Sequence, residues 1–157
     1  MFGNKNYYCL VAGLKEYTLD ADTKGFDARE IIDEILEELS GADAKAVRLL
    51  YGYYDCENII ACREQRGRHN PLGNLSREQV EQVLNEACYS LLPSRLAKVV
   101  ELYAEKEDEE RDEEVKLDAN FEHALFEAYY EELAASKCRF LVAWGEFDRN
   151  LRNIAAA

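Results

Sequence analysis

Residues that break helices are scarce in this sequence, which holds only two prolines and eight glycines among 157 residues. A β-rich fold needs such residues at its many turns, so their scarcity favours long helices. Long apolar runs are missing as well: the stretches nearest the two ends, residues 7–14 and 140–144, are far shorter than the roughly 20 residues of a membrane-spanning helix. Neither resembles a signal peptide. We therefore expect a cytoplasmic protein without direct membrane insertion, which reaches a membrane only through a partner complex.

The cysteines give no sign of a disulfide framework or a zinc site. There are five of them, an odd number, and no two are spaced as Cys-x-x-Cys; they are Cys9, Cys56, Cys62, Cys88 and Cys138. Without a secretory signal they are predicted to be reduced thiols. Several fall on apolar helix faces, where a cysteine behaves as a small hydrophobic residue.

Basic residues are outnumbered by acidic ones, 19 against 32, which gives a formal net charge of −13. Nucleic-acid binding depends on lysines and arginines that neutralise phosphates, so this balance argues against it. An anionic membrane surface would be repelled for the same reason. A basic protein partner would instead be attracted. With 48% hydrophobic and 11% aromatic residues, the chain is also too apolar to be disordered.

One acidic run supplies nearly half of the net charge. Residues 105–114 hold eight acidic and two basic residues. Blocks of like charge repel one another and stay solvated, so residues 105–116 are interpreted as an exposed helix end or linker. A docking site for a basic partner is the alternative.

What is present is helical periodicity. Residues 27–39 carry an apolar face opposite four acidic residues, and two further short helices are predicted around residues 46–54 and 58–62. Ser40 and Ser76 each begin a capping-box pattern. The helix after Ser76 has the clearest apolar stripe in the sequence, which consists of Val80, Val83, Leu84, Ala87, Cys88 and Leu91.

The last 40 residues suggest one very long helix. They contain no proline and a single glycine, and an unbroken helix of that length would span about 60 Å. An apolar seam recurs along it at positions i, i+4, i+7, i+11 and i+14, formed by Phe140, Trp144, Phe147, Leu151 and Ile154. The chain ends without a helix C-cap, so we expect residues 1–157 to be the N-terminal part of a longer protein, folded as a single helical domain.

Reactive side chains are few, and no motif brings them together. The two histidines are His69, in a Gly/Pro-rich loop, and His123, which lacks the acidic residue three positions earlier that a di-iron ligand pair needs. Zinc-binding spacings, phosphate-binding glycine loops and a nucleophile elbow are all absent from the sequence. We therefore expect neither an enzyme nor a cofactor or metal site.

Two segments share an unusual pattern of an aromatic residue, glycine, any residue, an aromatic residue and aspartate, followed by asparagine and an aliphatic residue. The first begins at Tyr51 and places its polar residues at Asp55 and Asn58; the second begins at Trp144 and places them at Asp148 and Asn150. One interpretation is that each polar residue caps a helix while the aromatic residues pack. The other is a degenerate internal repeat of helical units.

These residues carry a resemblance to a known family. The segment from Asp55 to Arg63, followed by a loop and Ser76-x-Glu-x-Val, resembles the helical repeat of the central-stalk connector of V/A-type rotary ATPases, a component designated C, or d in eukaryotes. The opening Tyr7-Tyr-Cys-Leu-Val-Ala looks more specifically like an uncharacterised bacterial family that begins Tyr-Tyr-x-Leu-Val-Ala, and whose genes lie among those for V-type ATPase subunits. The second segment departs from the connector's pattern, because its asparagine is shifted by one residue.

The resemblance implies an all-α bundle of about five to seven helices that acts as a non-catalytic connector between the rotor shaft and the membrane ring of this ion-transport machine. Such a connector should expose aromatic residues to its partner, and Tyr129, Tyr130 and Trp144 are the candidates. A free-standing acidic adaptor is the alternative. A small-anion-binding bundle is a third hypothesis, for which the one dense basic cluster is Arg63, Arg66, Arg68 and His69.

Overall fold

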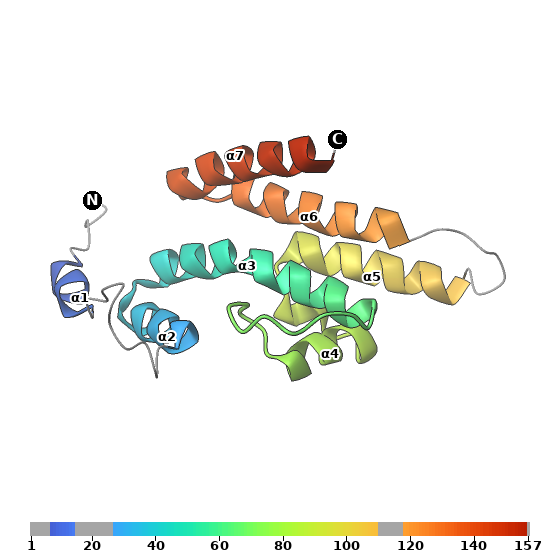
Figure 1. Ribbon diagram of the computed structural model, residues 1–157, viewed down its shortest axis with the longest axis horizontal. Helices are drawn as coiled ribbons and strands as arrows, with labels where there is room; N and C mark the ends of the chain where they lie inside the picture. The colour runs from blue at the N-terminus through green and yellow to red at the C-terminus, as the bar shows by residue number, and fades with distance from the viewer. Residues whose placement is uncertain (1–6, 15–26, 110–117, 157) are drawn as a thin grey trace. The chain divides into compact units, whose positions relative to one another are not determined.

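A computed structural model describes residues 7–14, 27–109 and 118–156 of the chain (Figure 1). Every regular element in these ranges is helical, which confirms the predicted all-α class. The elements are α1 (Tyr8–Gly13), α2 (Ala28–Glu38), α3 (Gly41–Arg63), α4 (Arg77–Asn85), the short 3₁₀ helix η1 (Tyr89–Leu91), α5 (Ser94–Glu109), α6 (Asp118–Ala134) and α7 (Arg139–Ala156).

The chain divides into two compact units, residues 1–47 and 48–157, where the sequence predicted a single domain; α3 runs through the boundary. In the first unit, the Asp27 side chain caps α2 by accepting hydrogen bonds from the backbone N–H groups of Arg29 and Glu30, at 2.8 and 3.4 Å. Ile32 and Leu36 form the buried stripe of α2.

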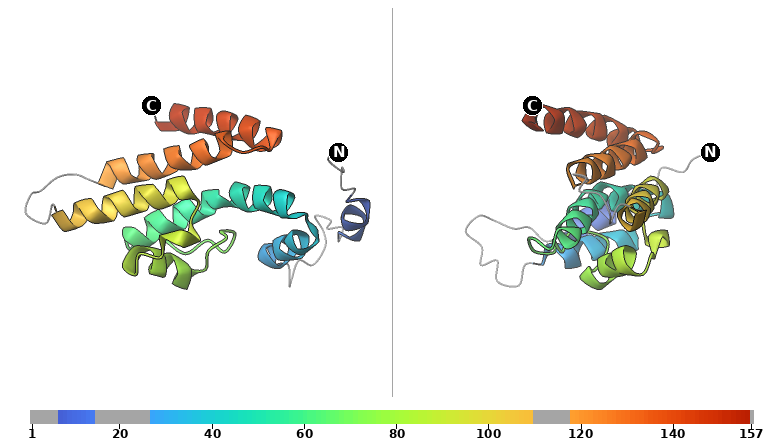
Figure 2. Two further views of the ribbon diagram at one scale, coloured as in Figure 1. Left: turned by 180° about the vertical axis from the view of Figure 1, so that it is seen from behind. Right: turned by 90° about the vertical axis from the view of Figure 1, so that its right-hand side faces the viewer.

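Helix α6 lies in the middle of the second unit. In the views of Figures 1 and 2, α7 runs along one side of α6, while α3 and α5 lie on the other side and α4 lies beyond α3. Residues of α6 are buried on several faces of the helix rather than along one stripe, namely Phe121, Leu125, Phe126, Ala128, Tyr129, Tyr130 and Leu133. A helix that is apolar on several sides must be covered from several sides, which determines the layered arrangement.

Helix α3 corrects one prediction. The sequence suggested two helices around residues 46–54 and 58–62, but α3 continues without a break over 23 residues. Ser40 does begin it as predicted, because its hydroxyl accepts a hydrogen bond from the Asp43 N–H at 3.3 Å. Asp55 and Asn58 therefore lie inside the helix and do not cap one.

The predicted 40-residue C-terminal helix is also wrong, because the chain turns back between α6 and α7. Ala134 ends the first helix and Arg139 begins the second. At the place where the two helices meet, a Cβ atom on Gly145 would lie 2.9 Å from both Cβ and Cδ1 of Leu133, closer than ordinary van der Waals contact. Gly145 thus lets α7 lie close to the fully buried Leu133.

Helix α4 is shorter than its apolar stripe predicted. The Ser76 capping box is confirmed: the hydroxyl accepts from the Gln79 N–H at 3.2 Å, and the Gln79 side chain accepts from the Ser76 N–H at 2.9 Å. The helix then ends at Asn85, and Ala87 adopts a positive φ of 55°. Of the predicted acidic segment, residues 105–109 complete α5 and residues 110–116 lie outside the described ranges.

The close approach at Gly145 predicts a loss of stability in Gly145→Ala. The added methyl group must displace the buried Leu133 side chain, which we expect to lower the free energy of unfolding by about 1–3 kcal/mol. Gly41→Ala is the matched control, because its Cβ atom would have nothing within 4 Å and alanine favours a helix by up to about 1 kcal/mol. Urea unfolding followed by circular dichroism measures both. Equal stability of the two variants would contradict the close packing of α6 and α7.

Candidate functional site

The Asp55 carboxylate of the first shared segment binds a loop. The side chain is only 5% exposed. Its Oδ1 atom accepts a hydrogen bond from the Leu75 N–H at 2.9 Å, and its Oδ2 atom accepts one from the Asn74 amide at 2.7 Å. The Asn74 amide also donates to the backbone oxygen of Arg48 at 2.7 Å. A buried carboxylate is tolerated when it is hydrogen-bonded in this way.

Asn58 completes the attachment one helical turn further along. Its side-chain oxygen accepts from the Asn70 N–H at 2.7 Å, and its amide donates to the Asn70 oxygen at 2.9 Å. Gly73 passes between the two anchors, where a Cβ atom would lie 2.8 Å from both Oδ1 of Asp55 and Nδ2 of Asn58. We call Asp55, Asn58 and their loop partners the loop clamp; its role is structural, because its polar groups are occupied by the chain itself.

The second shared segment does not build a second clamp. Asp148 is half-buried and accepts a hydrogen bond from the Tyr130 hydroxyl at 2.8 Å, and Asn150 is exposed. The two segments share a different property, because the glycine of each faces α6. A Cβ atom on Gly52 would lie 3.5 Å from the ring of Tyr129, as Gly145 approaches Leu133.

The two segments also meet at one concave surface. A hollow of about 360 Å³ is lined by residues of α3, α6 and α7, namely Leu50, Tyr51, Tyr53, Tyr54, Tyr129, Trp144 and Asp148. We call it the aromatic hollow. Sequence reasoning had found the two segments, but it gave no indication that they face the same space.

Beside this hollow, α7 exposes a continuous apolar surface. It is the seam recognised from the sequence, and its members Phe140, Trp144, Phe147, Leu151 and Ile154 are between 39% and 73% exposed. The rings of Phe140 and Trp144 stack at 6.4 Å between centroids, and those of Trp144 and Phe147 lie 6.0 Å apart. We call these five residues the α7 seam. Single exposed apolar residues are ordinary, but a contiguous row of them marks an interaction site.

Two of the three predicted interface residues are not on the surface. Tyr129 and Tyr130 are 1% and 3% exposed, because α6 is covered from both the α3 side and the α7 side. The Tyr129 hydroxyl donates to the backbone oxygen of Leu50 at 3.0 Å. Trp144 is exposed and belongs both to the α7 seam and to the aromatic hollow.

Burial changes the acid–base behaviour of these two tyrosines. Desolvation raises the pKa of Tyr129 well above its usual range, and desolvation together with the Asp148 carboxylate does the same for the pKa of Tyr130. Both hydroxyls therefore keep their protons at physiological pH and act as hydrogen-bond donors.

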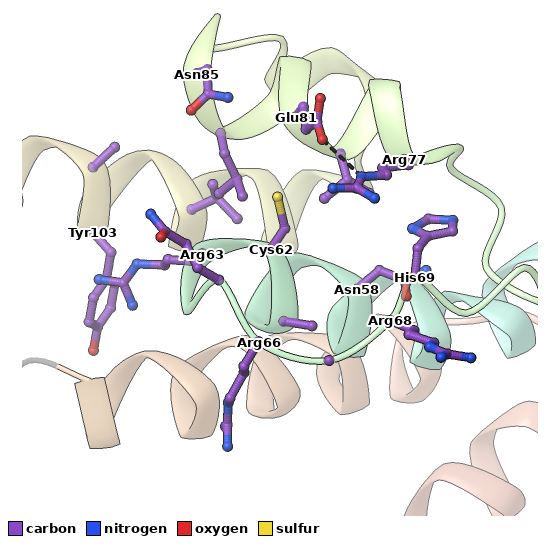
Figure 3. A pocket seen from close by; sticks show the side chains of 17 residues that line it. Asn58, Cys62, Arg63, Arg66, Arg68, His69, Arg77, Glu81, Asn85 and Tyr103 are labelled. Carbon is purple, nitrogen blue, oxygen red and sulfur yellow. Dashed lines mark hydrogen bonds and ion pairs between the residues drawn. The ribbon is translucent and has the colours of Figure 1, made fainter.

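The basic cluster of the anion hypothesis surrounds a separate pocket of about 570 Å³ between α3, α4 and α5 (Figure 3). Arg63, Arg66, Arg68 and His69 all line it, together with Arg77. Their charges do not converge, however. Figure 3 shows Arg77 and His69 near one end, while Arg66 and Arg68 extend away from α4.

The interactions of these arginines explain the divergence. The Arg63 guanidinium lies 4.2 Å above the ring of Phe121, Arg77 forms an ion pair with Glu81 at 3.1 Å, and Arg66 forms an ion pair with Glu64. Burial raises the pKa of the nearby Cys62 thiol, which makes its thiolate scarce. The pocket offers an anion no group of convergent donors.

Within the described residues, no group of three or more histidine, cysteine, aspartate or glutamate side chains could hold a metal ion. His123 is exposed on α6, and burial raises the pKa of the Cys56 thiol well above its usual range. Over the same ranges, the chain forms no helix that is both long and apolar enough to cross a lipid bilayer.

The different environments of the two asparagines predict different effects of mutation. Asn58→Ala should lower the free energy of unfolding by about 2–4 kcal/mol, because it leaves the buried N–H and oxygen of Asn70 unpaired. Asn150→Ala changes an exposed side chain and should remain within about 0.5 kcal/mol of the original protein. Chemical unfolding of both variants measures the difference. If they were equally destabilised, both segments would make a loop clamp.

The raised tyrosine pKa values predict a stability loss at alkaline pH. The unfolded chain releases tyrosine protons near pH ~10 while the folded protein retains them, so stability is complete below that pH and falls above it by about 1.4 kcal/mol per pH unit for each tyrosine. Urea unfolding between pH ~8 and ~11 should show this decline, with a shallower slope in Tyr130→Phe. The same slope in both proteins would contradict the raised pKa of Tyr130.

Comparison with known proteins gives one family and no characterised relative. Neither a curated protein nor a solved structure matches the chain. The sequence pattern of one family, described as "Protein of unknown function (DUF2764)", matches residues 4–157. The chain therefore belongs to this family of uncharacterised function, DUF2764.

Proposed function

We propose that this protein is a non-catalytic interaction protein, which packs the α7 seam against an amphipathic helix within a V/A-type rotary ATPase. The observation that carries the proposal is the α7 seam itself. Folding leaves this row of five large apolar side chains in contact with solvent, although the same helix buries Leu141 and Gly145 against α6.

The spacing of the seam indicates what kind of partner fits it. Its members are separated alternately by four and three residues, which is the spacing of the a and d positions in a coiled-coil helix. Such a seam is complementary to another helix that carries its own row of apolar side chains. Aromatic residues are enriched at the centres of protein interfaces, and three of the five members are aromatic.

The identity of the partner rests on the sequence resemblance. The segment from Asp55 to Arg63 resembles a repeat of the central-stalk connector, and the opening Tyr7-Tyr-Cys-Leu-Val-Ala resembles a family encoded among the genes for V-type ATPase subunits. A connector of that kind needs binding surfaces and no reactive groups. The net charge of −13 adds long-range attraction to basic surfaces of a partner and speeds association more than it adds affinity.

Phe147→Glu tests the proposal. Phe147 lies in the middle of the α7 seam and is 55% exposed, so a glutamate there should leave the fold intact and place a charge inside the interface. Asn153→Glu is the matched control, because it adds the same charge at an exposed position roughly 120° around α7 at about 100° per residue.

The measurement is co-purification of the tagged protein with the V/A-type ATPase subunits of the same organism. The original protein and Asn153→Glu should retain these subunits, while Phe147→Glu should retain at least about tenfold less. Circular dichroism confirms that both variants are folded. Absence of ATPase subunits from the original protein would favour the free-standing acidic adaptor, and equal retention by both variants would rule out the α7 seam.

A further inference from the structure

We propose that the aromatic hollow binds a lysine or arginine side chain that the partner helix carries. This inference rests on the proposed function for its partner and adds the chemistry of the contact. The α7 seam accounts for apolar packing, whereas the hollow beside it combines aromatic ring faces with a carboxylate. That combination recognises cations.

The aromatic wall of the hollow comes mainly from α3. Tyr51, Tyr53 and Tyr54 are half-buried and form a connected group. The rings of Tyr51 and Tyr54 lie 6.1 Å apart with an interplanar angle of 30°, and those of Tyr53 and Tyr54 lie 5.6 Å apart at 87°. Because the rings are inclined to one another, one wall offers a cation both ring faces and hydroxyl oxygens.

Asp148 supplies the negative charge on the α7 side. Its Oδ2 atom accepts the hydrogen bond from the Tyr130 hydroxyl, while no hydrogen bond to Oδ1 is found among the described residues. The Tyr130 phenol keeps its proton and fixes the direction of the carboxylate without neutralising it. A half-buried carboxylate that is oriented and incompletely bonded is suited to a partner's ammonium or guanidinium group.

The chain's own cations near the hollow are bonded to other carboxylates. Arg149 forms an ion pair with Glu127, and Arg152 forms one with Glu122 at 2.6 Å. The Arg152 guanidinium also lies 3.6 Å above the centroid of the Phe126 ring. Asp148 therefore keeps its charge for an incoming side chain.

Trp144 connects the hollow to the α7 seam, since it belongs to both. A partner helix packed along the seam would pass the opening of the hollow, so a long, flexible basic side chain on that helix could reach into it. The volume of about 360 Å³ accommodates such a side chain. The cation would also fix the position of the partner helix along the otherwise uniform seam.

The test uses the isolated chain and the fluorescence of Trp144, its sole tryptophan. The probes are N-acetyl-lysine N-methylamide and the matched norleucine compound, which has the same backbone and an uncharged side chain. We expect the lysine probe to change the Trp144 emission saturably at a concentration about tenfold lower than the norleucine probe.

Asp148→Asn removes the charge but keeps an oxygen that can accept from the Tyr130 hydroxyl. In this variant the two probes should act at equal concentrations, and thermal unfolding should show an unchanged fold. Equal responses of the original protein to both probes, or no response to either, would overturn the inference, as would an unchanged lysine preference in Asp148→Asn. These outcomes need no ATPase component, so they are distinguishable from a failed co-purification.

Discussion

The burial of α6 is the constraint on which the rest of the second unit depends. Its seven buried residues, from Phe121 to Leu133, cover more of its circumference than one neighbouring helix can shield. Cover from opposite sides requires the chain to turn back after Ala134, so that α7 packs on α6 through Leu141 and Gly145. A helix held by one face exposes its other faces, and the second apolar face of α7 is the seam.

Polar side chains in this protein stabilise its loops and helix contacts. Asp55 and Asn58 hold the loop that follows α3, and their oxygens and amide are bonded to that loop. The arginines of the basic pocket are divided among Phe121 and nearby glutamates. Asp148 differs from these groups, because its single hydrogen bond among the described residues leaves capacity for a further donor. Recognition by shape, aromatic surface and charge follows from this distribution.

The sequence predicted local structure better than it predicted neighbours. The capping boxes at Ser40 and Ser76 were predictable because their partners lie three residues away. The partners of Asp55 lie 19 and 20 residues away in the chain, so the same residue was interpreted as a cap. Periodicity also revealed the α7 seam, but exposure depends on what covers a face. That is why Tyr129 and Tyr130, adjacent on α6, are both in the core while the seam is outside.

The central claim is that this protein acts through the α7 seam, and photo-crosslinking from position 147 in living cells tests it most directly. A photoreactive phenylalanine analogue in place of Phe147 keeps the aromatic character of the site, and the same analogue at exposed position 153 reports the neighbouring face of α7. The account predicts that position 147 forms crosslinks with an apolar helix of the V/A-type ATPase, and that position 153 forms few. Equal crosslinking from both positions, or none to the ATPase from position 147, would contradict it.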